Sequence, residues 1–174
     1  MKKVNAILLM LFMVAALFGN DLKKAPNYKL KDINNKTVEL KEALKKGPVL
    51  LNFWASWCTP CKEEMPELEA LYKKYKDKGL QMHVVSIDKG SGISKAKGHI
   101  KSNNFTFVPL FDKGGKLLKK KFNQSPNRVP YTFFINKKGE ITMINKEGEV
   151  KSIPLKGKQT VETFERNIKH ILGL

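Results

Sequence analysis

The sequence predicts a single α/β domain in which helices pack against a central mixed β-sheet. The chain has 174 residues, about the length of one domain. Residues 49–55 and 80–87 are nearly continuous apolar runs of strand length, which is typical of strands buried on both faces. A helix-length segment, residues 59–76, separates the two runs. This alternation of strand and helix favours parallel pairing of the two strands.

The first half of the chain adds a hairpin and a short helix to this unit. Residues 26–40 alternate loosely in hydrophobicity around Asn34, a turn residue, and predict a hairpin ahead of the core. Residues 39–46 fit one or two helical turns. The segment 59–76 carries apolar side chains at helical spacing, namely Met65, Leu68, Tyr72 and Tyr75.

The second half predicts further helices and strands. Residues 93–101 and 116–121 fit helices, and residues 105–110 are strand-like. Residues 131–136 and 140–145 predict a second hairpin. A closing helix is indicated by one apolar stripe, Val161, Phe164, Ile168, Ile171 and Leu172.

The net charge of +17 comes from 33 basic and 16 acidic residues. Only Arg128 and Arg166 are arginines, so nearly all of the positive charge is carried by lysines. Recognition of bases and phosphates favours the arginine fork, and the chain has no nucleic-acid-binding motif. We therefore expect a lysine-rich solvated surface and no nucleic-acid partner.

The N-terminal residues have the form of an export signal. Lys2 and Lys3 precede an unbroken apolar run over residues 6–18. A bilayer span needs roughly 20 apolar residues, so this run fits a signal-peptide core better than a full transmembrane helix. We expect residues 1–19 to be a signal peptide or an N-terminal membrane anchor, and the protein to be periplasmic or otherwise extracytoplasmic.

The two cysteines lie three residues apart where the first buried strand meets the following helix. Thr59 and Pro60 open that helix, so Cys58 lies at its N-terminus, where free N–H groups and the helix dipole favour a thiolate. Cys61, one turn on, lies on the buried face. We expect it to attack only after Cys58 has formed a mixed disulfide.

Two structural uses of the cysteines are alternatives to this redox pair. A disulfide closing so short a loop removes little chain entropy, so stability alone is a poor reason for it. His83, His99 and His170 have no metal-ligand spacing to either cysteine, and each is expected at the surface or a strand edge. The sequence thus predicts neither a metal site nor a cofactor.

Glu64 is the second residue that points to chemistry. It shares a helix face with Leu68, Leu71 and Tyr75. A carboxyl group on that face beside Cys61 should be desolvated, which raises its pKa towards the range useful for proton transfer with the thiol. The alternative is that Pro66 kinks the helix and turns Glu64 to solvent. The neighbouring acidic residues are expected in solvent, namely Glu63, Glu67 and Glu69.

Residues 52–61 with Glu64 and Pro66, together with residues 129–136, resemble the thioredoxin superfamily. The pattern is most similar to its exported TlpA/ResA-like branch of thiol–disulfide oxidoreductases. The resemblance runs over residues 26–172, and the thioredoxin-like domain is expected to cover residues 26–174.

The resemblance implies a thioredoxin fold with an N-terminal β-hairpin extension, an insertion between the βαβ and ββα halves, and a cis bond before Pro130. It implies Cys58 as the attacking thiol, Cys61 as the resolving thiol and Glu64 as the acidic residue near them. A cis bond would leave the Val129 backbone facing the Cys58 sulfur, ready to pair with an extended substrate. The substrate-binding residues expected are Trp57, Thr59, Pro60, Val129 and Pro130.

Two positions depart from the pattern of the superfamily. Tyr131 stands where a threonine is more usual. Asn52 occupies the strand position that is a buried aspartate in cytoplasmic thioredoxins, so proton transfer would have to rely on Glu64 or on water.

The expected function is exchange of electrons with disulfides of other exported proteins through Cys58 and Cys61. The pair Thr59-Pro60 resembles reducing members of the branch, which predicts a reductant, with cytochrome c maturation as a process it would serve. The expected partners are cysteine-containing exported proteins and a membrane thiol reductant such as a DsbD/CcdA-like protein. Two alternatives stay open: a thiol peroxidase of the same fold, and a non-catalytic copper-binding or chaperone module.

Overall fold

The computed structural model describes residues 22–174. The expected signal peptide or membrane anchor, residues 1–19, lies outside the described residues. Within the described part of the chain, none of the helices is long and apolar enough to cross a membrane.

A seven-stranded mixed sheet forms the centre of the domain, with the strand order β2-β1-β5-β4-β3-β6-β9. The central strands β5, β4 and β3 are parallel to one another, and every other pair in this sheet is antiparallel. The expected α/β class and mixed sheet are confirmed. The strands are β1 (Lys29–Asp32), β2 (Thr37–Glu39), β3 (Val49–Trp54), β4 (Gln81–Ser86), β5 (Val108–Phe111), β6 (Tyr131–Ile135) and β9 (Leu155–Lys156).

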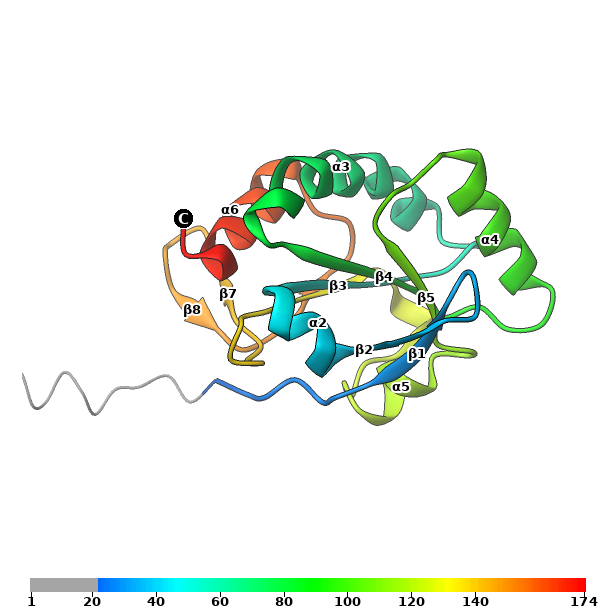
Figure 1. The fold of residues 1–174 in the computed structure, drawn as a ribbon, viewed down its shortest axis with the longest axis horizontal. Helices are drawn as coiled ribbons and strands as arrows, with labels where there is room; N and C mark the ends of the chain where they lie inside the picture. The colour runs from blue at the N-terminus through cyan, green and yellow to red at the C-terminus, as the bar shows by residue number, and fades with distance from the viewer. Residues whose placement is uncertain (1–21) are drawn as a thin grey trace, which may run out of the picture.

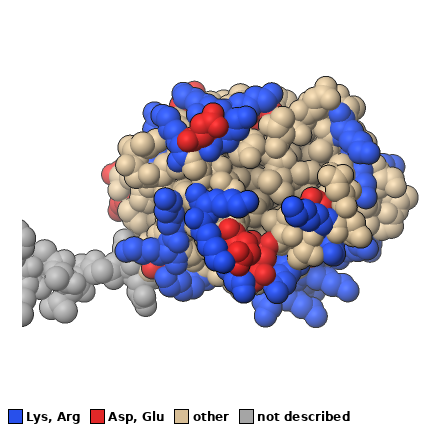
Figure 2. All heavy atoms as spheres, in the orientation of Figure 1, with Lys and Arg blue, Asp and Glu red and all other residues tan. Residues whose placement is uncertain are grey.

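The surface is rich in lysine, as expected: in the orientation of Figure 1, Lys and Arg side chains cover more of the visible face than Asp and Glu side chains do (Figure 2).

Helices cover both faces of the sheet (Figure 1). Three of them lie above it in this view, namely α3 (Thr59–Tyr75), α4 (Gly92–Ser102) and α6 (Val161–Leu172). Two shorter helices lie below it, α2 (Leu40–Lys46) and α5 (Lys116–Lys120). Short 3₁₀ turns follow α3 and precede β6, at Lys76–Lys78 and Pro126–Arg128.

The N-terminal hairpin and the insertion both join the main sheet. Strands β1 and β2 form the expected hairpin, and β1 pairs with β5 rather than with β3 or β4. The segment between β4 and β6 contains α4, β5 and α5, which is the expected insertion between the βαβ and ββα halves.

Strand β3 is the centre of the core, since all six of its residues are buried. Its side chains alternate between the two layers. Asn52 faces α3, where it bonds to Glu64, and Trp54 lies against His99 of α4 with ring centroids 5.6 Å apart. Phe53 faces the opposite layer and contacts the ring of Phe122 at 5.5 Å. The fold therefore places a polar side chain, Asn52, directly beneath the first turns of α3.

The expected hairpin of residues 131–136 with 140–145 forms only near its turn. The Asn136 N–H donates to the Glu140 carbonyl at 3.0 Å, the Thr142 N–H donates to the Phe134 carbonyl at 2.9 Å, and a bridge joins Ile135 to Ile141. Beyond Thr142 the expected second arm leaves β6, and β9 pairs with the first residues of β6 instead. The N–H of Ile144 donates to Asn167 Oδ1 of α6 at 2.7 Å, so the chain leaves β6 and turns towards that helix. It then forms a separate two-stranded sheet, β7 (Met143–Ile144) with β8 (Val150–Lys151).

Glu69 is buried, against the expectation that it lies in solvent. The residue is 6% exposed, and its side chain accepts hydrogen bonds from the backbone N–H groups of Thr106 at 2.8 Å and Phe107 at 3.3 Å. The Thr106 hydroxyl donates to it as well, at 2.7 Å. The segment before β5 has backbone donors without strand partners, and Glu69 supplies their acceptor. Its Nζ–Oε1 pair with Lys73 is also present, at 3.2 Å.

His83 is a core residue and not a surface or strand-edge histidine. It lies in the middle of β4, is 2% exposed, and its Nδ1 is 2.6 Å from the Tyr28 hydroxyl. Burial lowers the pKa of His83 to about 4, so the ring is neutral at physiological pH.

We predict that Glu69→Ala lowers the free energy of unfolding by about 2 kcal/mol, because buried backbone donors lose their acceptor. Glu69→Gln keeps one carbonyl acceptor and should cost about half as much. Urea unfolding measures both. Glu42→Ala, which removes an exposed ion pair with Lys45, is the control and should change stability by less than about 0.5 kcal/mol. Equal losses in all three variants would contradict this role of Glu69.

Candidate active site

Cys58 and Cys61 form a disulfide at the N-terminus of α3, with their Cα atoms 5.3 Å apart. Strand β3 ends four residues before Cys58, which is the N-cap residue of the helix. The backbone N–H of Cys61 donates to Cys58 Sγ at 3.3 Å, so the sulfur takes the position of an N-cap acceptor. After reduction, the same N–H group and the helix dipole would stabilise a thiolate on Cys58.

Both cysteines are buried, and Cys58 is slightly more exposed than Cys61. Cys58 is 4% exposed and Cys61 is 1% exposed, so Cys58 is the outer residue of the pair. Thr59 and Pro60, the first residues of α3, are exposed between them, and Trp57 projects into solvent with 59% of its surface exposed. A protein that approaches the disulfide thus meets Trp57, Thr59 and Pro60 first.

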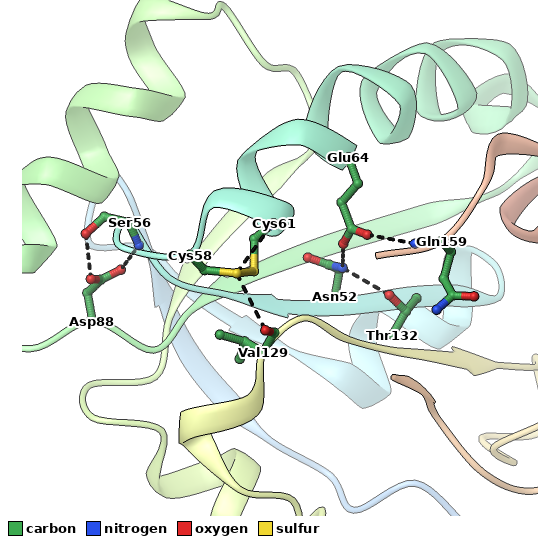
Figure 3. The surroundings of a disulfide bond; sticks show 9 residues. All are labelled: Asn52, Ser56, Cys58, Cys61, Glu64, Asp88, Val129, Thr132 and Gln159. Atoms are coloured by element: carbon green, nitrogen blue, oxygen red, sulfur yellow. Dashed lines mark hydrogen bonds between the residues drawn. A yellow bond between two sulfur atoms is a disulfide. The ribbon is translucent and has the colours of Figure 1, made fainter. Parts of the chain in front are cut away.

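Val129 and Pro130 lie beside the disulfide, and the peptide bond that joins them is cis, as the resemblance implied. The Val129 carbonyl oxygen is 3.5 Å from Cys58 Sγ (Figure 3). The sulfur of a disulfide has no hydrogen, so this contact becomes a hydrogen bond only when Cys58 is a thiol.

Glu64 is fully buried on α3, one turn beyond Cys61. The helix continues through Pro66 without interruption, so the alternative in which Glu64 turns to solvent is wrong. The amide Nδ2 of Asn52 donates to Glu64 Oε1 at 2.9 Å, and the backbone N–H of Gln159 lies 3.4 Å from Oε2 (Figure 3).

Burial raises the pKa of Glu64 to about 7. The hydrogen bonds from Asn52 and Gln159 oppose this rise. Glu67 adds to it through like charge, and Lys158 works against it. A carboxyl group with a pKa near 7 exchanges protons readily at neutral pH, and this one lies one helical turn from the buried cysteine.

A cavity of about 430 Å³ lies next to Trp57, at the edge of the sheet where β3 and β4 end. Asp88, which follows β4, accepts hydrogen bonds from the Ser56 N–H at 2.9 Å and the Ser56 hydroxyl at 2.7 Å. The sequence analysis did not select Asp88. Its position just after a buried parallel strand is the signal that could have found it, because the carboxyl ends of parallel strands meet at one edge of the sheet. Other residues that line the cavity are Lys89, Lys95, Pro126 and Asn127.

Between residues 22 and 174, the structure has no group of three or more histidine, cysteine, aspartate or glutamate side chains that could hold an ion.

Comparisons with known proteins agree with this site. Residues 22–144 match the model of the AhpC/TSA family. The chain is 36% identical over 149 residues to the thiol-disulfide oxidoreductase ResA of Bacillus thuringiensis, covering 86% of this chain and 77% of that protein. It is 35% identical over 120 residues to ResA of Bacillus subtilis, covering 69% and 64%.

Solved structures share the fold. StoA from Bacillus subtilis superposes with a TM-score of 0.60 at 25% identity, covering 80% of this chain and 94% of that one. A thiol:disulfide interchange protein of the thioredoxin family from Chlorobium tepidum gives a TM-score of 0.68 at 19% identity, covering 87% and 97%. The chain therefore belongs to the AhpC/TSA family of the thioredoxin superfamily, as a ResA-like thiol–disulfide oxidoreductase with a Cys58–Cys61 pair.

Proposed function

We propose that this protein is an exported reductant of protein disulfides, in which Cys58 attacks the target and Cys61 resolves the mixed disulfide. The observation that carries the proposal is the asymmetry of the pair. Cys58 is the outer cysteine at a helix N-terminus beside the Val129 carbonyl, whereas Cys61 is buried one helical turn before the buried Glu64.

The first step forms a mixed disulfide. The Cys58 thiolate attacks one sulfur of the target disulfide, a new S–S bond forms, and the other target sulfur leaves as a thiolate. The backbone of Val129, beside Pro130, offers an extended target chain a hydrogen-bonding edge next to the sulfur. Trp57 would contact the side chains that flank the target cysteine, and the adjacent cavity would receive one of them.

The second step releases the reduced target. Cys61 gives its proton to the Glu64 carboxylate and attacks Cys58 Sγ, and the bond between Cys58 and the target breaks. The departing sulfur leaves with the electron pair of that bond and takes up a proton. In total, two electrons pass from the cysteine pair to the target, and the Cys58–Cys61 disulfide forms.

The proposal also covers the location of the protein and its partners. The composition of residues 1–19 and the likeness to proteins named ResA support a location outside the cytoplasm. We propose cysteine-containing exported proteins as substrates, among them proteins of cytochrome c maturation. A membrane thiol reductant such as a DsbD/CcdA-like protein would return the pair to its reduced form, since exported dithiols otherwise become oxidised.

The direction of electron flow is tested by redox titration of the oxidised protein against glutathione. We expect a potential nearer to the reducing end of the range for such pairs, about −270 mV, than to the oxidising end, about −120 mV. A value at the oxidising end would overturn the proposed direction. Rapid consumption of hydrogen peroxide without reduction of insulin disulfides would instead favour the thiol peroxidase alternative.

We predict that Cys61→Ser traps substrates as stable mixed disulfides through Cys58, because the second attack is lost. Non-reducing gels and mass spectrometry of the exported fraction would detect them. The Cys58→Ser variant and the double variant are the controls and should trap nothing. Equal trapping by Cys58→Ser would mean that the roles of the two sulfurs are reversed. Capture that survives loss of both cysteines would favour a non-catalytic binding module.

Glu64 gives a prediction about the pH dependence of stability. Its pKa is raised to about 7 in the folded protein, so the folded state binds more protons than the unfolded chain between the ordinary value of 4.5 and about 7. Stability should therefore fall as the pH rises through this window. At about 1.4 kcal/mol per pKa unit, the full effect approaches about 3 kcal/mol.

Urea unfolding of the oxidised protein tests this. From about pH 5 to about pH 8, the unfolding free energy of Glu64→Gln should rise relative to wild type by up to about 3 kcal/mol. Glu63→Gln, on the same helix but exposed, is the control and should run parallel to wild type. Parallel profiles for Glu64→Gln and wild type would refute the raised pKa.

A further inference from the structure

Asn52 has one polar atom that the fold leaves unused. The residue is 1% exposed. Its amide Nδ2 donates two hydrogen bonds, to Glu64 Oε1 at 2.9 Å and to Thr132 Oγ1 at 3.0 Å. Its carbonyl Oδ1 is buried and has no hydrogen-bond partner among the residues that the structure describes. A buried polar atom without a partner is uncommon in proteins and calls for an explanation.

The orientation of the amide is fixed by its neighbours. When Glu64 is ionised, rotating the amide by half a turn would place Oδ1 against the carboxylate, where two acceptors would face each other. Nδ2 therefore stays towards Glu64, and Oδ1 lies on the opposite side of the amide. Figure 3 shows this oxygen on the side of the Cys58–Cys61 bridge.

The oxidised pair offers Oδ1 no hydrogen, because neither sulfur of a disulfide carries one. Reduction changes this. A partner dithiol transfers two electrons to the pair and becomes a disulfide itself, the bond between Cys58 and Cys61 breaks, and Cys61 takes up a proton. The S–H group of Cys61 is then a new donor in the buried region that Oδ1 faces.

We propose that Asn52 is a positioning residue that links the resolving cysteine to its proton acceptor. Its Nδ2 holds the Glu64 carboxyl in place, and in the reduced protein its Oδ1 accepts a hydrogen bond from the Cys61 thiol, directly or through one water. The amide itself gains and loses no proton. For the reaction, this inference rests on the proposed function, in which Cys61 gives its proton to Glu64.

Few other groups around Glu64 could replace Asn52 as the hydrogen-bond donor that positions the carboxyl. On α3, Glu67 lies one turn further along and repels a charge on Glu64. From the segment between β9 and α6, the Gln159 N–H reaches Oε2, and the Lys158 ammonium is paired with Glu63 at 2.9 Å. Among the sheet residues that the structure describes, only Asn52 donates to this carboxyl. Its hydrogen bond lowers the pKa of Glu64 against the effect of burial.

The thiol half of the proposal is tested by the infrared S–H stretching band in a Cys58→Ala background, where Cys61 is the single thiol. Asn52→Leu keeps the branched shape of the side chain and its number of heavy atoms and removes its polar atoms. The band should move towards the position of a thiol that is not hydrogen-bonded. Asn52→Asp keeps an acceptor and should leave the band close to the parent position.

The carboxyl half is tested by ¹³C NMR titration of Glu64 in the reduced protein. Both Asn52→Leu and Asn52→Asp remove the donor, so both should raise the titration midpoint relative to the parent, the second through like charge as well. Asn52→Leu should also slow resolution of a mixed disulfide on Cys58 by about tenfold or more in the otherwise wild-type protein.

Thr132→Val is the matched control, because it removes the other hydrogen bond of the Asn52 amide and leaves the contact with Glu64 in place. It should shift neither the S–H band nor the midpoint. An unchanged band and an unchanged midpoint in Asn52→Leu would each overturn the proposal, as would equal shifts in Thr132→Val. If Asn52→Leu does not fold, the midpoint in Asn52→Asp decides in the same way. Neither spectroscopic readout needs catalysis, so failure of wild-type protein to reduce insulin would count against the proposed function alone.

Discussion

The pairing of β3 with β4 on one side and β6 on the other is the constraint on which the site depends. Strand β4 runs parallel to β3, so the carboxyl end of each lies at the same edge of the sheet. Strand β6 runs antiparallel to β3, so its beginning lies at that edge too. Three loops therefore meet there, carrying Cys58 after β3, Asp88 after β4 and Val129 before β6. No side chain of the site could be placed without this arrangement of strands.

The buried carboxyl groups show how the number of hydrogen-bond donors decides protonation in this core. Burial pushes the pKa of Glu69 upwards, but donors from Thr106, Lys73 and Phe107 outweigh it and hold the pKa below its usual value. Glu64 is more deeply buried and has only the Asn52 amide at 2.9 Å and a longer contact to Gln159, so desolvation prevails. Two glutamates five residues apart on one helix thus have pKa values shifted in opposite directions. Glu69 is a charged structural acceptor, whereas Glu64 can take up and release a proton near neutral pH.

Local sequence patterns predicted most of the site, but they could not predict contacts between segments that are far apart in the sequence. The apolar run of β3 and the cysteine spacing located the helix N-terminus, and the spacing of three residues from Cys61 placed Glu64 on the buried face. The burial of Glu69 could not be predicted, because its donors come from a segment 37 residues later. Helical spacing alone places Glu69 off the apolar face, and only the path of that segment makes it a core residue.

The same limit applies to residues whose partners come from other strands or helices. His83 pairs with Tyr28, 55 residues earlier, across a part of the sheet that includes the N-terminal hairpin. The second arm of the expected hairpin is drawn away from β6 by Asn167 of the last helix. Periodicity indicates which face of an element is apolar. It does not indicate which distant donor or acceptor that face will meet.

A hydrogen bond to the Cys61 thiol would favour the reduced form, and by itself this shifts a redox pair towards the oxidising end. The size of the effect decides whether it conflicts with a reducing function. For a two-electron couple, about 30 mV corresponds to about 1.4 kcal/mol, so a neutral hydrogen bond worth about 1 kcal/mol moves the potential by only about 20 mV. The span from about −270 to about −120 mV corresponds to about 7 kcal/mol. A shift that large would require strong stabilisation of the Cys58 thiolate. Here that sulfur accepts a backbone hydrogen bond from Cys61, and Pro60, between the two cysteines, has no N–H to add. Asn52 can therefore hold the Cys61 thiol and the Glu64 carboxyl in position for proton transfer while the pair remains a reductant.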